Sequence, residues 1–126
     1  MRELKFRAWD KVEKKMLFDA DPFAIHVSGS NEPLLAETHR NEDCIFEQYT
    51  GIKDKNGKEI YIGDIVSERH GDIIGKIVQN PSGEYRIAWI GVFGGDSVLY
   101  DHHSLCEVIG NIHENPGLLV EINDVD

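Results

Sequence analysis

Long apolar runs and a secretory leader are both missing from this sequence. No stretch approaches the roughly 18 apolar residues that a membrane-spanning helix needs. The first residues alternate charged and apolar side chains, so no apolar segment follows the basic ones as it does in a signal peptide. We therefore expect a cytoplasmic protein that does not contact a membrane.

Cysteine is scarce. Cys44 and Cys106 are the only two in 126 residues, and neither belongs to a C-x-x-C pair. Such a pair would indicate zinc binding or redox chemistry. We expect two buried thiols, which stay unpaired in a reducing compartment.

Positive charge is also in short supply. The chain has 13 Lys and Arg against 23 Asp and Glu, for a net charge of −10. Residues 1–15 carry +3, so the remainder carries −13. Affinity for nucleic acid comes largely from Lys and Arg that neutralise phosphates, so we do not expect nucleic-acid binding. An acidic field instead attracts basic partners and keeps a protein soluble.

Strand patterns dominate what is present. Residues 4–9 alternate apolar and polar side chains, and the apolar run 16–18 follows after a polar turn, which predicts a hairpin over residues 3–19. Residues 19–43 show no consistent period and include turn-forming residues 28–33. We expect an irregular connection there, with the apolar residues 34–36 docking on the main body or on a neighbouring subunit.

The second half of the chain alternates short strands with turns. Residues 44–49 are rich in strand formers, and Asn56-Gly57 is expected to fill the positive-φ positions of a tight hairpin turn. The spacing around Asp54 does not fit a calcium-binding loop. Further strand-like runs cover residues 65–68, 73–78, 84–90 and 105–109, with Gly91 to Ser104 as a longer loop.

This pattern predicts a mainly β protein. The regular spacing of short strands favours a small, SH3-like antiparallel barrel, in which Gly75 supplies a bend or bulge. Asn115 and Pro116 are typical of a helix start, with Asn115 as the N-cap of a short terminal helical turn. We expect an N-terminal hairpin lobe with a variable connection over residues 1–48, the barrel over 49–122, and a frayed tail over 123–126.

Three segments carry a family resemblance. MRELKFRAWD at residues 1–10, YTGIKDKNGKEIYIGDIV at 49–66 and VIGNIHENP at 108–116 closely resemble the signature blocks of the YopX family of small phage and prophage proteins. The resemblance implies an early hairpin, a variable middle, a C-terminal β-barrel and self-association inside a bacterial host. It implies no established enzymatic activity and no agreed functional residues.

One cluster of titratable residues deserves an alternative interpretation. Asp101, His102 and His103, with His113 further along, contain residue types that bind catalytic zinc or nickel, which gives the hypothesis of a metal-dependent hydrolase. Adjacent residues on a strand point to opposite faces, so a surface loop is the preferred interpretation. Cys106 lies between Leu105 and Val108 in a predicted strand and is expected to be a small buried hydrophobe, so a cysteine-based catalytic site is disfavoured.

We predict no catalytic residue, no cofactor and no bound metal. The candidate partner-binding residues are Trp89, Phe93 and Tyr100, which would line a groove of the kind that SH3-like barrels use for peptides. Core packing is the alternative role for these aromatic side chains. The basic N-terminal hairpin with Trp9 leaves nucleic-acid association as a further, less favoured alternative.

The leading functional hypothesis is a non-enzymatic accessory protein. We expect a homo-oligomer that engages a host or phage protein through its barrel loops or acidic surface. Self-association is expected because the basic hairpin and the acidic remainder are complementary, and because an isolated hairpin is marginally stable.

Overall fold

The computed structural model describes residues 5–20, 43–69, 71, 73–91 and 95–119. The chain divides into two compact units, Glu3–Gln48 and Tyr49–Asp126, and each is described by itself below. Most of the described residues form β-strands, so the prediction of a mainly β protein is confirmed. No helix among these residues is long and apolar enough to cross a lipid bilayer.

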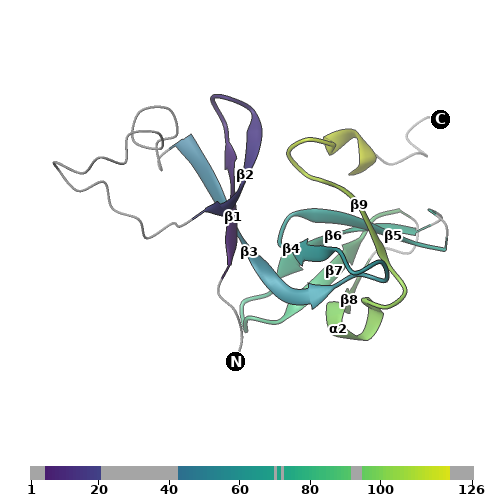
Figure 1. The fold of residues 1–126 in the computed structure, drawn as a ribbon. Coiled ribbons are helices and arrows are strands. Elements are labelled where there is room, and N and C mark those ends of the chain that lie inside the picture. The colour runs from purple at the N-terminus through teal and green to yellow at the C-terminus, as the bar shows by residue number, and fades with distance from the viewer. Residues whose placement is uncertain (1–4, 21–42, 70, 72, 92–94, 120–126) are drawn as a thin grey trace, which may run out of the picture. The chain divides into compact units, whose positions relative to one another are not determined.

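The N-terminal unit contains the predicted hairpin. Strand β1 (Phe6–Asp10) pairs antiparallel with β2 (Lys15–Ala20) and, on its other side, with the first half of β3 (Cys44–Lys53) (Figure 1). The buried carboxylate of Asp10 shapes the turn, because its Oδ1 accepts hydrogen bonds from the amides of Val12 and Glu13 at 2.8 and 2.9 Å.

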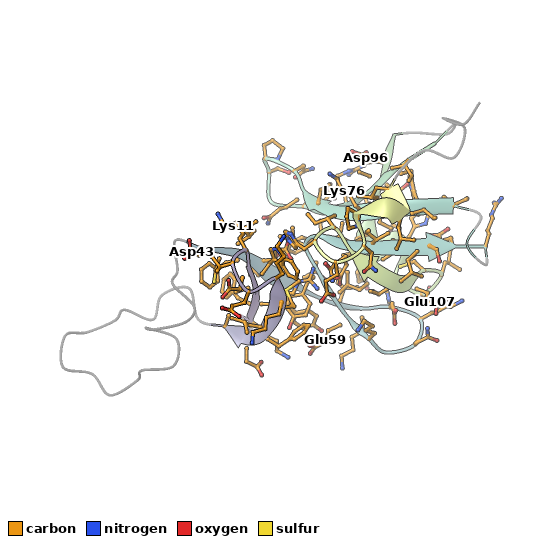
Figure 2. The ribbon with its side chains drawn as sticks, turned by 90° about the horizontal axis from the view of Figure 1, so that it is seen from above. Lys11, Asp43, Glu59, Lys76, Asp96 and Glu107 are labelled. Atoms are coloured by element: carbon orange, nitrogen blue, oxygen red, sulfur yellow. The ribbon has the colours of Figure 1, made fainter. Side chains whose placement is uncertain are left out.

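The start of β3 is fixed beside this turn. The amide of Lys11 donates to the carbonyl of Asp43 at 2.8 Å, and Figure 2 shows the two residues side by side. Further along the pair of strands, Arg7 lies opposite Glu47, and its Nε donates to Glu47 Oε1 at 2.9 Å. Both side chains are buried, so the pair is a structural ion pair and Arg7 adds little to a basic surface.

The second unit starts with a hairpin. The end of β3 pairs with β4 (Glu59–Tyr61), and the turn between them is closed by the amide of Gly57, which donates to the carbonyl of Asp54 at 2.9 Å. The predicted turn is confirmed in place and differs in type. Gly57 has φ +84°, whereas Asn56 is not among the described non-glycine residues with positive φ. This is the geometry of a three-residue loop that ends in a left-handed glycine.

Five antiparallel strands complete the second unit, in the order β8-β7-β6-β5-β9 (Figure 1). Their bounds are Asp64–Glu68 for β5, Ile73–Gln79 for β6, Tyr85–Trp89 for β7, Asp96–Val98 for β8 and Glu107–Asn111 for β9. The four strand-like runs of the sequence are confirmed, although the last strand covers Glu107–Asn111 and starts two residues later than the predicted run 105–109. Their buried faces form one core with the hairpin, and it consists of Ile60, Val66, Ile77, Tyr85, Ile87, Leu99 and Cys106.

Two elements lie where a long loop was predicted. Strand β8 is three residues long, and α2 (Leu99–His102) is a single helical turn. Elements this short leave no periodic signal in the sequence. The helical turn is nevertheless important, because it places Leu99, which is fully buried, in the core.

Gly75 has a different role from the predicted bend. It pairs in regular register with Val66 on β5 and with Trp89 on β7, and the described register shift near it lies instead between Ile65 and Val66. A Cβ on Gly75 would lie 2.6 Å from Ile87 Cγ2. Glycine is therefore needed here because the β7 side chains pack against the bare backbone, and the predicted bulge is wrong.

The C-terminal turn is confirmed, although its cap was misassigned. A 3-10 helix, η2, covers Pro116–Leu119, and the amide of Leu118 donates to the carbonyl of Asn115. The Asn115 side chain turns away from this helix, since its Oδ1 accepts from the amide of Asn111 at 3.2 Å. Asn115 therefore closes the loop after β9 and does not act as the expected helix N-cap.

Two backbone hydrogen bonds outside the sheet join the residues that flank β9 to the first part of the second unit. Lys55 donates its amide to the carbonyl of Cys106 at 3.1 Å, and Ile112 donates to Gly63 at 2.9 Å. The second unit thus combines the β3–β4 hairpin with a five-stranded antiparallel sheet. Assignment to the SH3-like class stays a prediction.

Candidate functional site

Most polar side chains of the two later signature blocks, 49–66 and 108–116, form hydrogen bonds with backbone groups. Asp54 is the clearest example, with a side chain that is almost completely buried. Its Oδ1 accepts from the amides of Asn56 and Lys58 at 2.8 and 2.9 Å, and its Oδ2 accepts from the amide of Val108 at 2.8 Å. This carboxylate joins the hairpin turn to β9, so it is not available for acid-base chemistry.

Other polar groups of these blocks have the same kind of role. Thr50 donates its hydroxyl to the carbonyl of Ile60 at 2.8 Å, and Asp64 Oδ2 accepts from the amide of Tyr61 at 2.8 Å. Asn111 Oδ1 accepts from the amides of His113 and Glu114 at 3.0 and 2.9 Å. The motifs that carry the family resemblance therefore encode turns and strand ends.

The two adjacent histidines are held by different partners. His102 Nδ1 lies 2.7 Å from Oε2 of Glu68, a buried carboxylate on β5, and its ring meets the Trp89 ring edge-on with centroids 5.7 Å apart. His103 Nδ1 lies 3.1 Å from the carbonyl oxygen of Lys53. The two imidazole rings therefore contact two different elements and do not converge on one point.

The hypothetical hydrolase cluster does not assemble among the described residues. Asp101 is exposed on α2, and His113 belongs to the loop after β9. Within the part of the chain that the structure describes, no group of three or more His, Cys, Asp or Glu side chains is arranged to hold a metal ion. The absence of a bound metal stays a prediction.

The two cysteines are free, in different environments. Cys106 is fully buried, whereas Cys44 is only half-buried, so the expectation of two buried thiols holds for one of them. Burial raises the pKa of the Cys106 thiol to about 12, with a smaller contribution from the nearby Glu68 carboxylate. A thiol with this pKa stays protonated at neutral pH and is a poor nucleophile.

Two of the three predicted partner-binding residues, Trp89 and Tyr100, lie in different environments. Trp89 is half-buried against the core, and its Nε1 donates to Ser97 Oγ at 2.9 Å. Phe93 lies outside the described residues. Tyr100 is 69% exposed on α2. The candidate partner-binding set therefore stays a prediction, and Tyr100 is more exposed than Trp89.

A surface hollow of about 480 Å³ lies beside Tyr100 in the second unit. Its volume is in the range of small-ligand sites. One wall is formed by the end of β3 and its turn, and the other by α2 and the residues after it. We call it the Tyr100 hollow; its lining consists of Tyr49, Gly51, Ile52, Lys53, Asp54, Lys55, Tyr100, His103 and Ser104.

The charge of the Tyr100 hollow differs from that of the whole chain. Lys53 and Lys55 are exposed, whereas the carboxylate of Asp54 is buried and accepts three backbone amide hydrogen bonds. No binding role was predicted for these two lysines from the sequence. The Lys-Asp-Lys pattern was visible, but α2 was not predicted, and α2 is what brings Tyr100 and His103 to the same place.

The N-terminal unit exposes apolar side chains. Val12 is 63% exposed, Phe18 is 58% exposed and Ile45 is 39% exposed. Strand β2, which carries Phe18, stands at the end of the strand order β2-β1-β3-β4, so it is an edge strand among the described residues. Exposed edges of this kind can pair with another chain.

Comparison with known proteins gives a family and a structural neighbour. The chain matches the YopX protein family over residues 5–120. It is similar to the crystal structure of protein EF1440 from Enterococcus faecalis, with 28% sequence identity and a TM-score of 0.65, over 95% of this chain and 100% of that chain. No curated protein matches the sequence.

Proposed function

The chain belongs to the YopX protein family, and we propose that it is a non-enzymatic phage or prophage accessory protein that acts as an oligomeric protein-binding or assembly module. We place it in the cytoplasm of a bacterial host. The observation that carries the assembly part is the exposed apolar surface of the N-terminal unit, next to the edge strand β2.

The non-catalytic part is supported by the way reactive groups are used. Asp54 is engaged by three backbone amides, and Cys106 is buried with a raised pKa. His102 and His103 are held by separate partners. A catalytic site needs a nucleophile or base within reach of a reacting atom and of a group that orients it. The described residues favour a structural use for each of these groups.

Self-association is supported by the surface of the N-terminal unit. Phe18 and Val12 present large apolar side chains to solvent, and burying such area against a second copy is favourable at ~25 cal/mol per Å². Exposed lysines at the β1–β2 turn would set register against an acidic surface of a neighbouring copy.

The two alternatives have less support. The hydrolase hypothesis needs Asp101, His102, His103 and His113 to converge, and the contacts of His102 and His103 lead to different elements. Nucleic-acid association through the N-terminal hairpin is weakened because the Arg7 guanidinium is buried against Glu47.

Light scattering coupled to gel filtration tests the proposal. We expect a mass that is a multiple of 14.3 kDa and that survives moderate salt, because apolar contacts are not screened. Phe18→Glu should shift the mass toward the monomer. Leu105→Glu is the matched control, since Leu105 is 57% exposed but lies in the second unit. A monomer at all concentrations would overturn the assembly proposal.

A further inference from the structure

The Tyr100 hollow combines three kinds of recognition group in one place. Tyr100 offers an exposed aromatic face, and its ring is tilted by 40° against that of His103 with centroids 5.6 Å apart. Ile52 contributes an apolar wall. Lys53 and Lys55 bring two exposed cations to the same lining. Aromatic anchors with a polar rim are typical of peptide-binding grooves.

His103 adds a hydrogen-bond acceptor. Its Nδ1 lies 3.1 Å from the carbonyl oxygen of Lys53, which can only accept, so Nδ1 must carry the hydrogen. In the neutral ring, Nε2 is then an acceptor. The contact also fixes the ring orientation, which lowers the entropy cost of using it in binding.

The charge of the hollow selects the class of ligand. Its lining carries two lysines and one aspartate, and both oxygens of that Asp54 carboxylate are taken by backbone amides. A single carboxylate on the ligand would therefore meet the two ammonium groups. A polyanion would instead meet the field of a chain with a net charge of −10. This balance favours an acidic peptide over a nucleic acid.

We propose that the Tyr100 hollow binds an extended segment of a partner protein that presents one acidic side chain beside an aromatic or large apolar one. The apolar side chain packs between Tyr100 and Ile52, and the acidic side chain faces Lys53 and Lys55. The inference deepens the proposed function and rests on its protein-binding part.

Selection from a phage-displayed library of random dodecapeptides tests this proposal with the full-length protein. We expect enrichment of sequences in which Asp or Glu stands within two positions of Phe, Tyr, Trp or Leu. A parallel selection on Tyr100→Ala protein identifies the peptides that bind without the Tyr100 ring. The exposed position of Tyr100 makes this variant compatible with folding. Sequences enriched equally on both proteins would overturn the proposal.

Binding of the enriched peptides is then measured by fluorescence anisotropy. Tyr100→Ala should weaken binding ~10-fold or more, as expected for an aromatic anchor. Lys53→Gln with Lys55→Gln should weaken it ~5-fold at low salt, with a smaller effect at high salt. Leu105→Ala and Lys58→Gln are matched controls, because both residues are exposed and neither lines the hollow.

Three outcomes would contradict the inference. They are equal binding of peptides whose acidic residue is replaced by its amide, full affinity in the double lysine variant, and competition by a dT12 oligonucleotide with higher affinity than the peptides. The assembly proposal is judged separately by the mass of Phe18→Glu. Loss of peptide binding with an intact oligomer therefore rejects the hollow alone, and a monomer that still binds peptides rejects assembly alone.

Discussion

Replacing Asp54 by asparagine should weaken the second unit, although the substitution changes few atoms. The carboxylate accepts three backbone hydrogen bonds, two on Oδ1 from the hairpin turn and one on Oδ2 from Val108. An asparagine can keep its oxygen toward the turn, but its amide group then faces the amide of Val108, and both are donors. The bonds within the turn are retained, and the side-chain hydrogen bond to the amide of Val108 is lost.

The magnitude follows from that single lost acceptor. A hydrogen bond to a charged group contributes ~1.5–3 kcal/mol, so we expect Asp54→Asn to lower the free energy of unfolding by about 2 kcal/mol. Asp54→Ala removes all three hydrogen bonds and should lower the free energy of unfolding by more, about 3–5 kcal/mol. This range allows for water molecules that bind the freed amides at the turn. With a urea m-value of ~1–2 kcal/mol/M, the asparagine variant should shift the midpoint by about 1–2 M.

Urea unfolding followed by tryptophan fluorescence measures this change. A Trp9→Phe background leaves Trp89 as the reporter, which belongs to the second unit. Asp101→Asn is the matched control, because it makes the same change of charge at an exposed position. If Asp54→Asn shifts the midpoint no more than Asp101→Asn does, the bridge to Val108 does not stabilise the unit and our account of this signature residue is wrong.

The remaining predictions concern glycines and a buried thiol. Gly57→Ala should lower the free energy of unfolding by ~1 kcal/mol through backbone strain alone, since Gly57 has φ +84° and open space around its Cβ position. Gly57→Asn should lower it less, because asparagine tolerates this conformation. Gly75→Ala should cost ~1–3 kcal/mol through the clash with Ile87, and an unchanged melting temperature would contradict the close packing. Burial raises the pKa of the Cys106 thiol to about 12, against an ordinary value of 9.0. The unfolded chain therefore loses this proton at lower pH than the folded one, so the free energy of unfolding should fall as the pH rises above 9. Urea midpoints that depend equally on pH in Cys106→Ala would refute this. In the native protein at neutral pH, iodoacetamide should modify Cys44 faster than Cys106, as mass spectrometry of the labelled peptides would show.

Much of the strand framework could be predicted because its signal is local. The runs around Val66, Ile77 and Ile87 are rich in strand-forming residues and are separated by turns that contain glycine or proline, which is enough to place a strand. The turn at Gly57 was predictable for the same reason, since asparagine before glycine reports a local conformational need.

What failed depended on side-chain contacts that local sequence patterns do not encode. Gly75 was expected to bend a strand, yet it is glycine because Ile87 and Trp89 occupy the space of its Cβ. Asn115 was expected to cap a helix, but its side chain reaches back to Asn111.

The candidate site was the least predictable part. Tyr100 was selected as an aromatic residue in a loop, and its lysine neighbours were not, because only α2 brings that loop against the end of β3. Trp89 was selected for the same chemistry, but its indole is engaged by Ser97 and the core.

The bridge from Asp54 to Val108 also has a consequence for how the chain folds. It joins residues 54 positions apart, and β5 pairs with β9 across a similar distance in sequence. Such contacts form late, because a long loop must close before they yield any stabilisation. On the ribosome, the second unit must wait for β9 to emerge, and until then the apolar strands β5, β6 and β7 lack the strand that covers one edge. A chain stalled before residue 107 should therefore expose that edge and be the form most prone to aggregate.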